Sequence, residues 1–427
     1  MEKLNEYTFR GISIDSIDLK CLLNTKGLVM DCAVTEKLSS TYRLSSDPRN
    51  YQSLYLSDGI SAALVDIGAS RLPVGDDKEF RRAIDVLCSN SVEGDEAREK
   101  IGTPFVVRLV DGLPVLFGDG EFLDQISFPL QNDYYEQIAP SGTPFIEVST
   151  LQADRWNSWA YLWPCDFALR GEPCQFCGAG LATAKAVERG EKPAGVCPVQ
   201  DLAAMVEYSV RHANVCSLQI TGGSSMDGNC EARYIIPYLD AIGETTGWDR
   251  LSEDILLYVT PPSDKGFLDE YISHGARRIA CSVEVWDEDL ASIITPGKIK
   301  YTGRKRHLEC WDFLVGNYGQ NVAFSNFVLG IEPFESVREG VLETAKRGVY
   351  PGGCIWSCMG NACNGISTPP GLDFYRRCKE LFYDVYREYG FIPDRTPMPN
   401  DLQAEIYNYL VADDAVERGQ APIPKPS

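Results

Sequence analysis

Three cysteines in one short segment carry the clearest chemical signal of the chain. Eight residues separate Cys165 from Cys174, and two separate Cys174 from Cys177. Three thiolates on a [4Fe–4S] cluster leave one iron open to a substrate or cofactor. A zinc ion fits the same residues if a fourth nitrogen or sulfur ligand joins them, and Cys197 is the nearest spare one. The spacing therefore indicates a metal site and leaves both metals open.

The composition supports metal binding or catalysis by some of the cysteines. The chain has 427 residues, 15 cysteines and a net charge of −21. It has no apolar run long enough to span a membrane and no signal peptide, which predicts a cytoplasmic protein whose thiols stay reduced. The negative charge disfavours nucleic acids. We therefore expect a small-molecule or peptide substrate, with no nucleic-acid or membrane partner.

The first 150 residues read as an α+β domain, either an accessory unit or a substrate-binding one. Asp58-Gly59 and Asp111-Gly112 each stand between β-rich runs, which is typical of hairpin turns. Between them, Asp77–Ser91 has apolar residues at helical spacing. No motif that carries chemistry is found in this part.

Residues 151–390 alternate short β-rich runs with amphipathic helical segments, which predicts an α/β fold with a partial or full (β/α) barrel. Reactive groups of such a barrel lie at the carboxyl ends of its strands. Residues 391–427 are expected to form a helix near Asp401–Leu410 and a flexible tail. The expected strands are Trp159–Trp163, Cys216–Thr221, Ile255–Val259, Ile279–Glu284, Val322–Leu329 and Gly353–Cys358. The expected helices include Pro198–Ala213, Gly266–His274 and Ser336–Arg347.

Several strand ends carry residues suited to holding a ligand. Gly222-Gly223-Ser224 follows the second strand, where glycines let a ligand approach the backbone, although a tight turn explains them equally well. Ser282 and Glu284 share one face of the fourth strand, and Glu284 suits either a ligand contact or a salt bridge. Arg304 and, second, Lys298 belong to a basic cluster that favours an anionic partner.

In this order, the segments resemble the radical S-adenosylmethionine (SAM) superfamily over about residues 155–365. The resemblance implies a barrel of the radical SAM type, with the cluster on Cys165, Cys174 and Cys177. Two departures stand out: the first cysteine gap has eight residues where three are usual, and Ser224 replaces an acidic residue.

The same resemblance assigns residues to SAM. The glycine pair would hold its amino group, Glu284 its ribose, Arg304 (or Lys298) its carboxylate, and Gly330 would flank its adenine. The full set of SAM-binding residues so implied is Phe176, Gly222, Gly223, Ser224, Ser282, Glu284, Arg304 and Gly330.

The implied activity is reductive cleavage of SAM, followed by abstraction of a hydrogen atom from a small metabolite or cofactor precursor by the 5′-deoxyadenosyl radical. A flavodoxin- or ferredoxin-type protein would supply the electron. One alternative is a cobalamin-dependent radical SAM methyltransferase, although residues 1–150 lack a cobalamin motif. An alternative of another class is a zinc-binding, non-redox protein that binds a ligand.

The last cysteines of the barrel are open to several interpretations. Cys358 ends the sixth strand, on the active-site side, and is the candidate catalytic thiol. Cys358, Cys363 and Cys378 together are a candidate site for an auxiliary iron–sulfur cluster. Plain packing is the alternative, and it fits Cys354 best.

Overall fold

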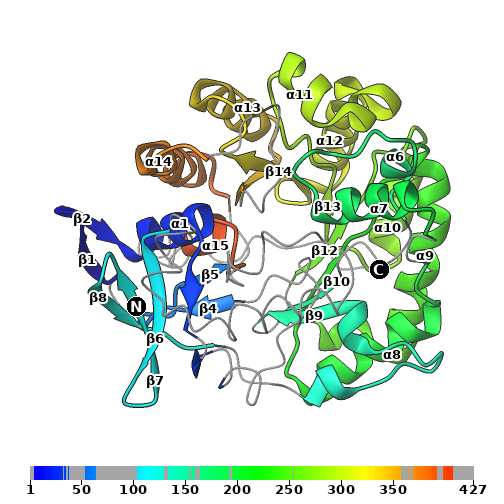
Figure 1. Ribbon diagram of the computed structural model, residues 1–427. Helices are drawn as coiled ribbons and strands as arrows, with labels where there is room; N and C mark the ends of the chain where they lie inside the picture. The colour runs from blue at the N-terminus through cyan, green and yellow to red at the C-terminus, as the bar shows by residue number, and fades with distance from the viewer. Residues whose placement is uncertain are drawn as a thin grey trace.

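A parallel sheet that curls into a half-barrel organises the computed structural model (Figure 1). Its order is β15-β14-β13-β12-β11-β10-β9, with β10 to β15 parallel and β9 antiparallel at one edge. The strands are β9 (Ser149–Gln152), β10 (Arg155–Ser158), β11 (Ser217–Ile220), β12 (Ile255–Tyr258), β13 (Arg278–Ala280), β14 (Ala323–Leu329) and β15 (Tyr350–Ile355). The structure describes residues 4–31, 33–34, 37, 53–63, 103–128, 133–152, 155–158, 164–191, 195–252, 254–356, 365, 369–391 and 398–406.

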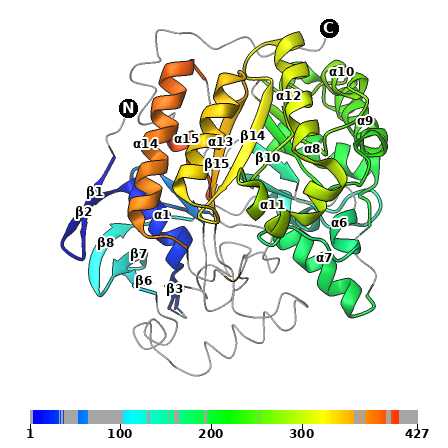
Figure 2. The same cartoon turned by 90° about the horizontal axis from the view of Figure 1, so that it is seen from above.

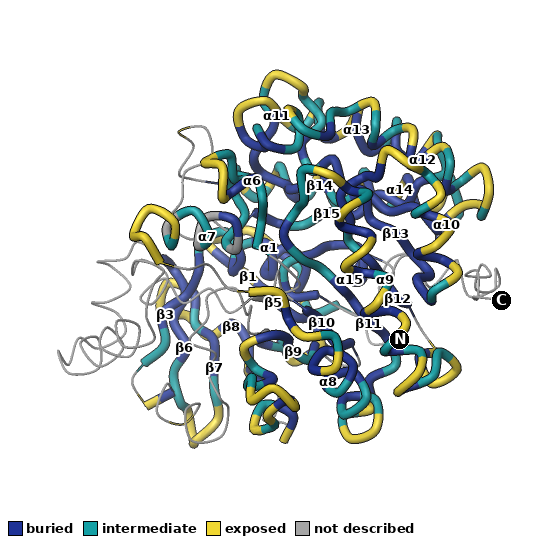
Figure 3. The backbone as a smooth tube through the Cα atoms, turned by 90° about the vertical axis from the view of Figure 1, so that its right-hand side faces the viewer, coloured by how far each residue is buried: buried dark blue, intermediate teal, exposed yellow. Residues whose placement is uncertain are grey.

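Helices on the outside of the sheet connect successive parallel strands, as βα crossovers require. They bury one apolar face against the strands, as α8 does with Leu202, Met205 and Val206. Figure 3 shows the strands buried and the exposed residues on the outer turns of the helices. The helices are α6 (Asp166–Leu169), α7 (Gly178–Glu188), α8 (Val199–His212), α9 (Gly228–Thr245), α10 (Gly266–Ser273), α11 (Glu288–Ile294), α12 (Arg304–Tyr318), α13 (Phe334–Lys346) and α14 (Leu372–Tyr389).

This architecture confirms the α/β partial barrel. Five of the six expected strands lie within a few residues of β11 to β15. The expected first strand, 159–163, lies outside the described residues, and β10 comes directly before it.

The N-terminal part up to residue 128 gathers on the opposite side from α8–α12, as Figure 2 shows. Residues 133–147 instead pack against α8 through Tyr134, Phe145 and Tyr208. Both expected hairpin turns are present: β4 (Ser53–Tyr55) pairs with β5 (Ser61–Ala63), and β6 (Phe105–Val110) with β7 (Leu113–Gly118). Asp111 and Gly112 have φ of 51° and 77°, as a tight hairpin turn requires. The expected helix at 77–91 lies outside the described residues. The other elements are β1 (Glu6–Phe9), β2 (Ile12–Asp15), α1 (Ser16–Lys26), β3 (Val29–Met30), β8 (Glu121–Gln125) and the 3₁₀ turns η1 (Asp133–Glu136) and η2 (Phe145–Glu147).

A segment near the C-terminus, 398–406, packs along the edge strand β15. The Ile355 N–H donates to the carbonyl of Asn400 (2.6 Å), and the Leu402 N–H donates to that of Gly353 (3.0 Å). The segment contains the short helix α15 (Gln403–Glu405), within the helix expected at 401–410, and residues 407–410 lie outside the described part.

Lys20 of α1 joins this segment to the N-terminal part. Its ammonium group lies 2.7 Å from Glu405 Oε1, and the two side chains are 0% and 1% exposed. It also donates to the carbonyl of Met398 (2.8 Å), while the Asn24 amide donates to that of Pro399 (2.9 Å). None of the described helices is long and apolar enough to cross a membrane.

The buried ion pair leads to a first prediction. Lys20→Met leaves the buried Glu405 carboxylate without its ion-pair partner, which should lower the free energy of unfolding by about 3–5 kcal/mol. The double variant Lys20→Met/Glu405→Leu should recover most of that loss, because it removes both charges. Urea denaturation measures both changes.

Lys346→Met, at an exposed position of α13, is the control and should stay within about 0.5 kcal/mol of wild type. A single variant as stable as the wild type would show that the pair does not hold the segment.

Candidate active site

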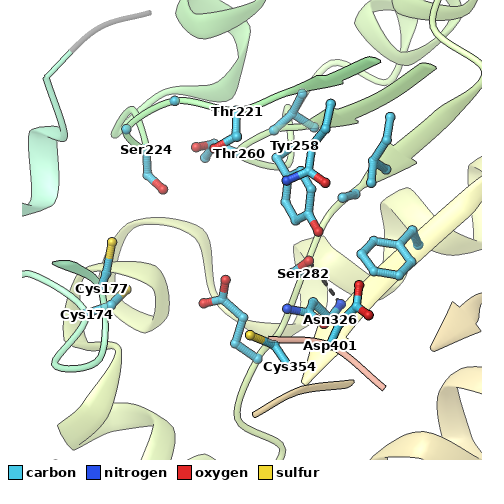
Figure 4. A pocket seen from close by; sticks show the side chains of 18 of the residues that line it. Cys174, Cys177, Thr221, Ser224, Tyr258, Thr260, Ser282, Asn326, Cys354 and Asp401 are labelled. Atoms are coloured by element: carbon cyan, nitrogen blue, oxygen red, sulfur yellow. Dashed lines mark hydrogen bonds between the residues drawn. The ribbon is translucent and has the colours of Figure 1, made fainter. Parts of the chain in front are cut away.

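The concave side of the half-barrel carries an open cavity of about 310 Å³. Every strand from β10 to β15 contributes a lining residue: Arg155, Gln219, Tyr258, Ala280, Asn326 and Cys354. Cys165, Cys174 and Cys177 line the same cavity, so the structure brings the cysteine triad to the concave side of the sheet. Figure 4 shows Cys174 and Cys177 on one side, and Asn326, Cys354 and Asp401 on the other.

The loop that carries the triad is docked onto the end of β11. The Asp166 N–H donates to the carbonyl of Ser224 (2.9 Å), and Asp166 Oδ2 accepts from the Met226 N–H (3.1 Å). Gly223 has no side chain for a steric reason: a Cβ there would lie 2.5 Å from both the Cα and the N of Cys165. This backbone-to-backbone contact fixes Cys165 next to the glycine pair.

The three thiols are partly buried and lie beside a carboxylate. Burial raises the pKa of Cys177 to about 11 and that of Cys174 well above its ordinary value, and the negative charge of Glu284 adds to both shifts. The Gly180 N–H donates to Cys177 Sγ (3.3 Å) and partly offsets the shift. Thiolates in this position need a positive charge, such as iron, to become stable.

Within the described residues, no three His, Cys, Asp or Glu side chains are arranged to hold one metal ion. A [4Fe–4S] cluster makes a different demand, because its thiolates bind separate irons and lie further apart than ligands of a single ion. Three cysteines lining one cavity fit that donor set.

Glu284 and Lys298 form a partly buried ion pair at the cavity wall, with 2.7 Å between Oε2 and Nζ and each side chain 17% exposed. Glu284 has a φ of 65°, a strained value for a residue with a side chain. Backbone hydrogen bonds with Asn326 and Val328 of β14, both 3.0 Å, hold it there. Burial opposes the charge of Lys298, but Glu284 and Cys174 outweigh it and raise the lysine's pKa.

Most of the predicted SAM-binding residues gather in the cavity: Phe176, Gly222, Gly223, Ser224, Ser282 and Glu284. Ser282 Oγ also accepts a hydrogen bond from the Asn326 N–H (3.1 Å). Lys298, the second choice for the carboxylate, lines the cavity as well.

Arg304 and Gly330 do not line the cavity. The Arg304 guanidinium donates to the carbonyls of Val285 (3.0 Å) and Trp286 (2.8 Å) and stacks 4.4 Å from the Trp286 ring centroid. Gly330 has a φ of 110°, and a Cβ there would lie 2.7 Å from the Tyr375 hydroxyl. Packing against α14 therefore explains this glycine.

The candidate cysteines of the last barrel strand divide into three cases. Cys358 and Cys363 lie outside the described residues. Cys378 is fully buried in the core and does not line the cavity. Cys354, expected to be a packing residue, does line it, and its Sγ accepts a hydrogen bond from Asn400 Nδ2 (2.8 Å). Burial raises the Cys354 pKa to about 12, which keeps its thiol protonated.

Glu231 is a cavity residue that the sequence did not reveal. It is 2% exposed and accepts hydrogen bonds from the Thr260 N–H (2.7 Å) and the Ser225 N–H (3.0 Å). Burial raises its pKa to about 7, against the lowering effect of these bonds. An acidic residue in the first turn of a helix is common, so the local sequence does not mark Glu231. Its role is visible only in the structure, where it joins the loop at Ser225 to the loop at Thr260.

Part of the chain is similar in sequence to a known enzyme. A stretch of 158 residues, 35% of the chain, is 28% identical to bacteriochlorophyllide c C-7(1)-hydroxylase of Chlorobaculum limnaeum. The match spans 39% of that hydroxylase, so the chain covers well under half of its length. No protein-family model matches the chain.

Gly223→Ala tests the contact beneath Cys165. The new Cβ must displace backbone, so we expect a loss of about 1–3 kcal/mol in the free energy of unfolding and a shifted cysteine loop in a crystal structure. Gly316→Ala is the matched control. Gly316 lies within α12, where an added Cβ would meet nothing within 4 Å outside its own turn of the helix, and the variant should gain about 0.5–1 kcal/mol. Equal stability of Gly223→Ala and wild type, with an unmoved loop, would contradict the contact.

Glu231 gives a prediction about pH. Its carboxyl group binds a proton more tightly in the folded chain, so its stabilising effect is complete below pH 4.5 and is lost as pH rises through about 7. Between these limits, the unfolding free energy of wild type should fall by about 3 kcal/mol relative to Glu231→Gln. Chemical denaturation at several pH values measures the difference.

Glu244→Gln, at an exposed position of the same helix, should show no such trend. A difference between wild type and Glu231→Gln that is independent of pH would refute the assignment.

Proposed function

We propose that this chain is a radical SAM enzyme that abstracts a hydrogen atom from a small metabolite or cofactor precursor. Cys165, Cys174 and Cys177 would hold a [4Fe–4S] cluster, and SAM would bind in the adjoining cavity. The observation that carries the proposal is that the three thiols line one cavity with the glycine pair and with Glu284 and Lys298. When bound, these groups supply a reductively generated carbon radical able to cleave an unactivated C–H bond.

The chain's own residues would bind and orient SAM. Gly222 and Gly223 expose backbone without side chains, so a polar ligand can approach closely. Lys298 offers a positive charge for a carboxylate, and Glu284 offers acceptors for an ammonium group or for hydroxyls. Glu284 is held by β14, and Lys298 is held by Glu284 and by the Ser282 carbonyl (3.1 Å), so little ordering is required when a ligand binds.

The position of the cavity on the concave side of the half-barrel suits radical chemistry, because a reactive intermediate must meet its substrate before it meets solvent. The similarity to a hydroxylase also supports the proposal, since hydroxylation at carbon breaks a C–H bond. We assign residues 1–150 to an accessory domain, residues 151–390 to the barrel core and residues 391–427 to a C-terminal helix and tail. A flavodoxin- or ferredoxin-type protein would be the electron donor.

The test is anaerobic incubation of the reduced, iron-loaded protein with SAM. We expect methionine and 5′-deoxyadenosine, about four irons per chain and an iron–sulfur absorption band. Cys174→Ala removes one of three protein ligands and should abolish both cluster and products. Cys230→Ala, an exposed cysteine outside the cavity, is the matched control and should retain them.

Stoichiometric zinc without iron would support the non-redox alternative and overturn the proposal. About eight irons per chain would instead support an auxiliary cluster. A correctly loaded cluster that forms no 5′-deoxyadenosine would also count against the function.

A further inference from the structure

The cavity wall opposite the cysteine triad carries buried polar groups that the proposed SAM site does not use. Asp401 is 6% exposed; its Oδ2 accepts from Gln403 Nε2 (2.9 Å), but its Oδ1 has no partner among the described residues. Asn326 Oδ1 likewise has no partner in that part of the chain. Both residues line the cavity, and Figure 4 shows them on the side away from Cys174 and Cys177.

These two oxygens belong to one face. The backbones of Asp401 and Cys354 pair in an isolated antiparallel β-bridge. The Asn326 side chain lies within hydrogen-bonding reach of the same cysteine. Tyr258, on β12, lines the same cavity. We call Asn326, Cys354 and Asp401 the distal face.

The backbone that carries the distal face is fixed before any ligand arrives. The Asn326 N–H donates to Ser282 Oγ (3.1 Å), and its carbonyl accepts from the Glu284 N–H (3.0 Å). Asp401 lies in the segment held along β15 and by Lys20, and the Gly353 N–H donates to Gln403 Oε1 (3.1 Å). A rigid wall with unpaired acceptors is therefore preorganised for a hydrogen-bond donor.

An unpaired buried acceptor is costly, and a ligand that donates to it recovers that cost. The surroundings favour an uncharged donor over a cation. Arg155 lines the same cavity, and burial together with the neighbouring Glu405 raises the pKa of Asp401 well above its ordinary value, against the opposing charges of Lys20 and Arg155. We propose that the distal face is the substrate-anchoring subsite, and that it binds an uncharged group with N–H or O–H donors, such as an amide, a lactam or a hydroxyl. Its assignment to the substrate rests on the proposed function.

Three small ring compounds can test the subsite on the full-length protein. The probes are 2-pyrrolidinone, which has an N–H donor; N-methyl-2-pyrrolidinone, which lacks it; and pyrrolidine, which is a cation at neutral pH. Saturation-transfer NMR titrations give their dissociation constants. We expect 2-pyrrolidinone to bind at least about tenfold more tightly than either of the others, as loss of one buried hydrogen bond implies.

Asp401→Leu and Asn326→Leu should each weaken 2-pyrrolidinone by about tenfold and leave N-methyl-2-pyrrolidinone within about twofold. Asn317→Ala, on the exposed surface of α12, is the control and should match wild type. Circular dichroism checks folding. If neither leucine variant folds, the comparison of the three probes on wild type still tests whether the subsite prefers an uncharged N–H donor.

Equal binding of the lactam and its N-methyl form, tighter binding of pyrrolidine, or no binding of the lactam would each overturn the subsite. Binding of these probes requires neither cluster nor SAM. A failed subsite is therefore distinct from a failed radical SAM activity, which the formation of 5′-deoxyadenosine measures separately.

Discussion

The contact between the backbones of Gly223 and Cys165 is the constraint on which the rest of the site depends. A Cβ at residue 223 would lie 2.5 Å from backbone atoms of Cys165. Without it, the triad loop reaches the end of β11, where Asp166 binds the residues after the glycine pair. Because the ends of parallel strands share one edge of a sheet, this single approach brings three thiols to a cavity shared by six strands.

A second constraint is electrostatic. Glu284 lies beside the thiols with a strained backbone, and a buried carboxylate there is tolerable because Lys298 lies 2.7 Å away. The pair is held by β14 on one side and by the π-helical turn Lys298–Thr302 on the other. Strained residues and π-helical turns are common at functional sites, where a ligand can replace one partner of an ion pair.

Local patterns predicted much of this structure, and contacts between distant segments were harder to predict. The Asp-Gly turns and the alternation of strands and helices are properties of short windows, and both are confirmed. Glu231 and Cys354 line the cavity together with residues that are remote in sequence. A short stretch of sequence therefore cannot reveal that they belong to the site. Arg304 matches an anion-binding pattern, yet its guanidinium is engaged by the carbonyls of Val285 and Trp286. The assignment of ligands to these residues stays a prediction.

The segment 398–406 covers the open edge of the half-barrel. The edge strand β15 would expose unpaired backbone groups, and the segment pairs with them at Gly353 and Ile355. That pairing also brings Asp401 into the cavity, opposite the triad. The two walls therefore have different anchors. The triad loop depends on β11, whereas Cys354 and Asp401 of the distal face depend on β15 and Lys20, and Asn326 depends on β14. Because Asp401 and the triad loop are anchored on different strands, a substitution of Asp401 should leave the loop that carries the cysteines in place.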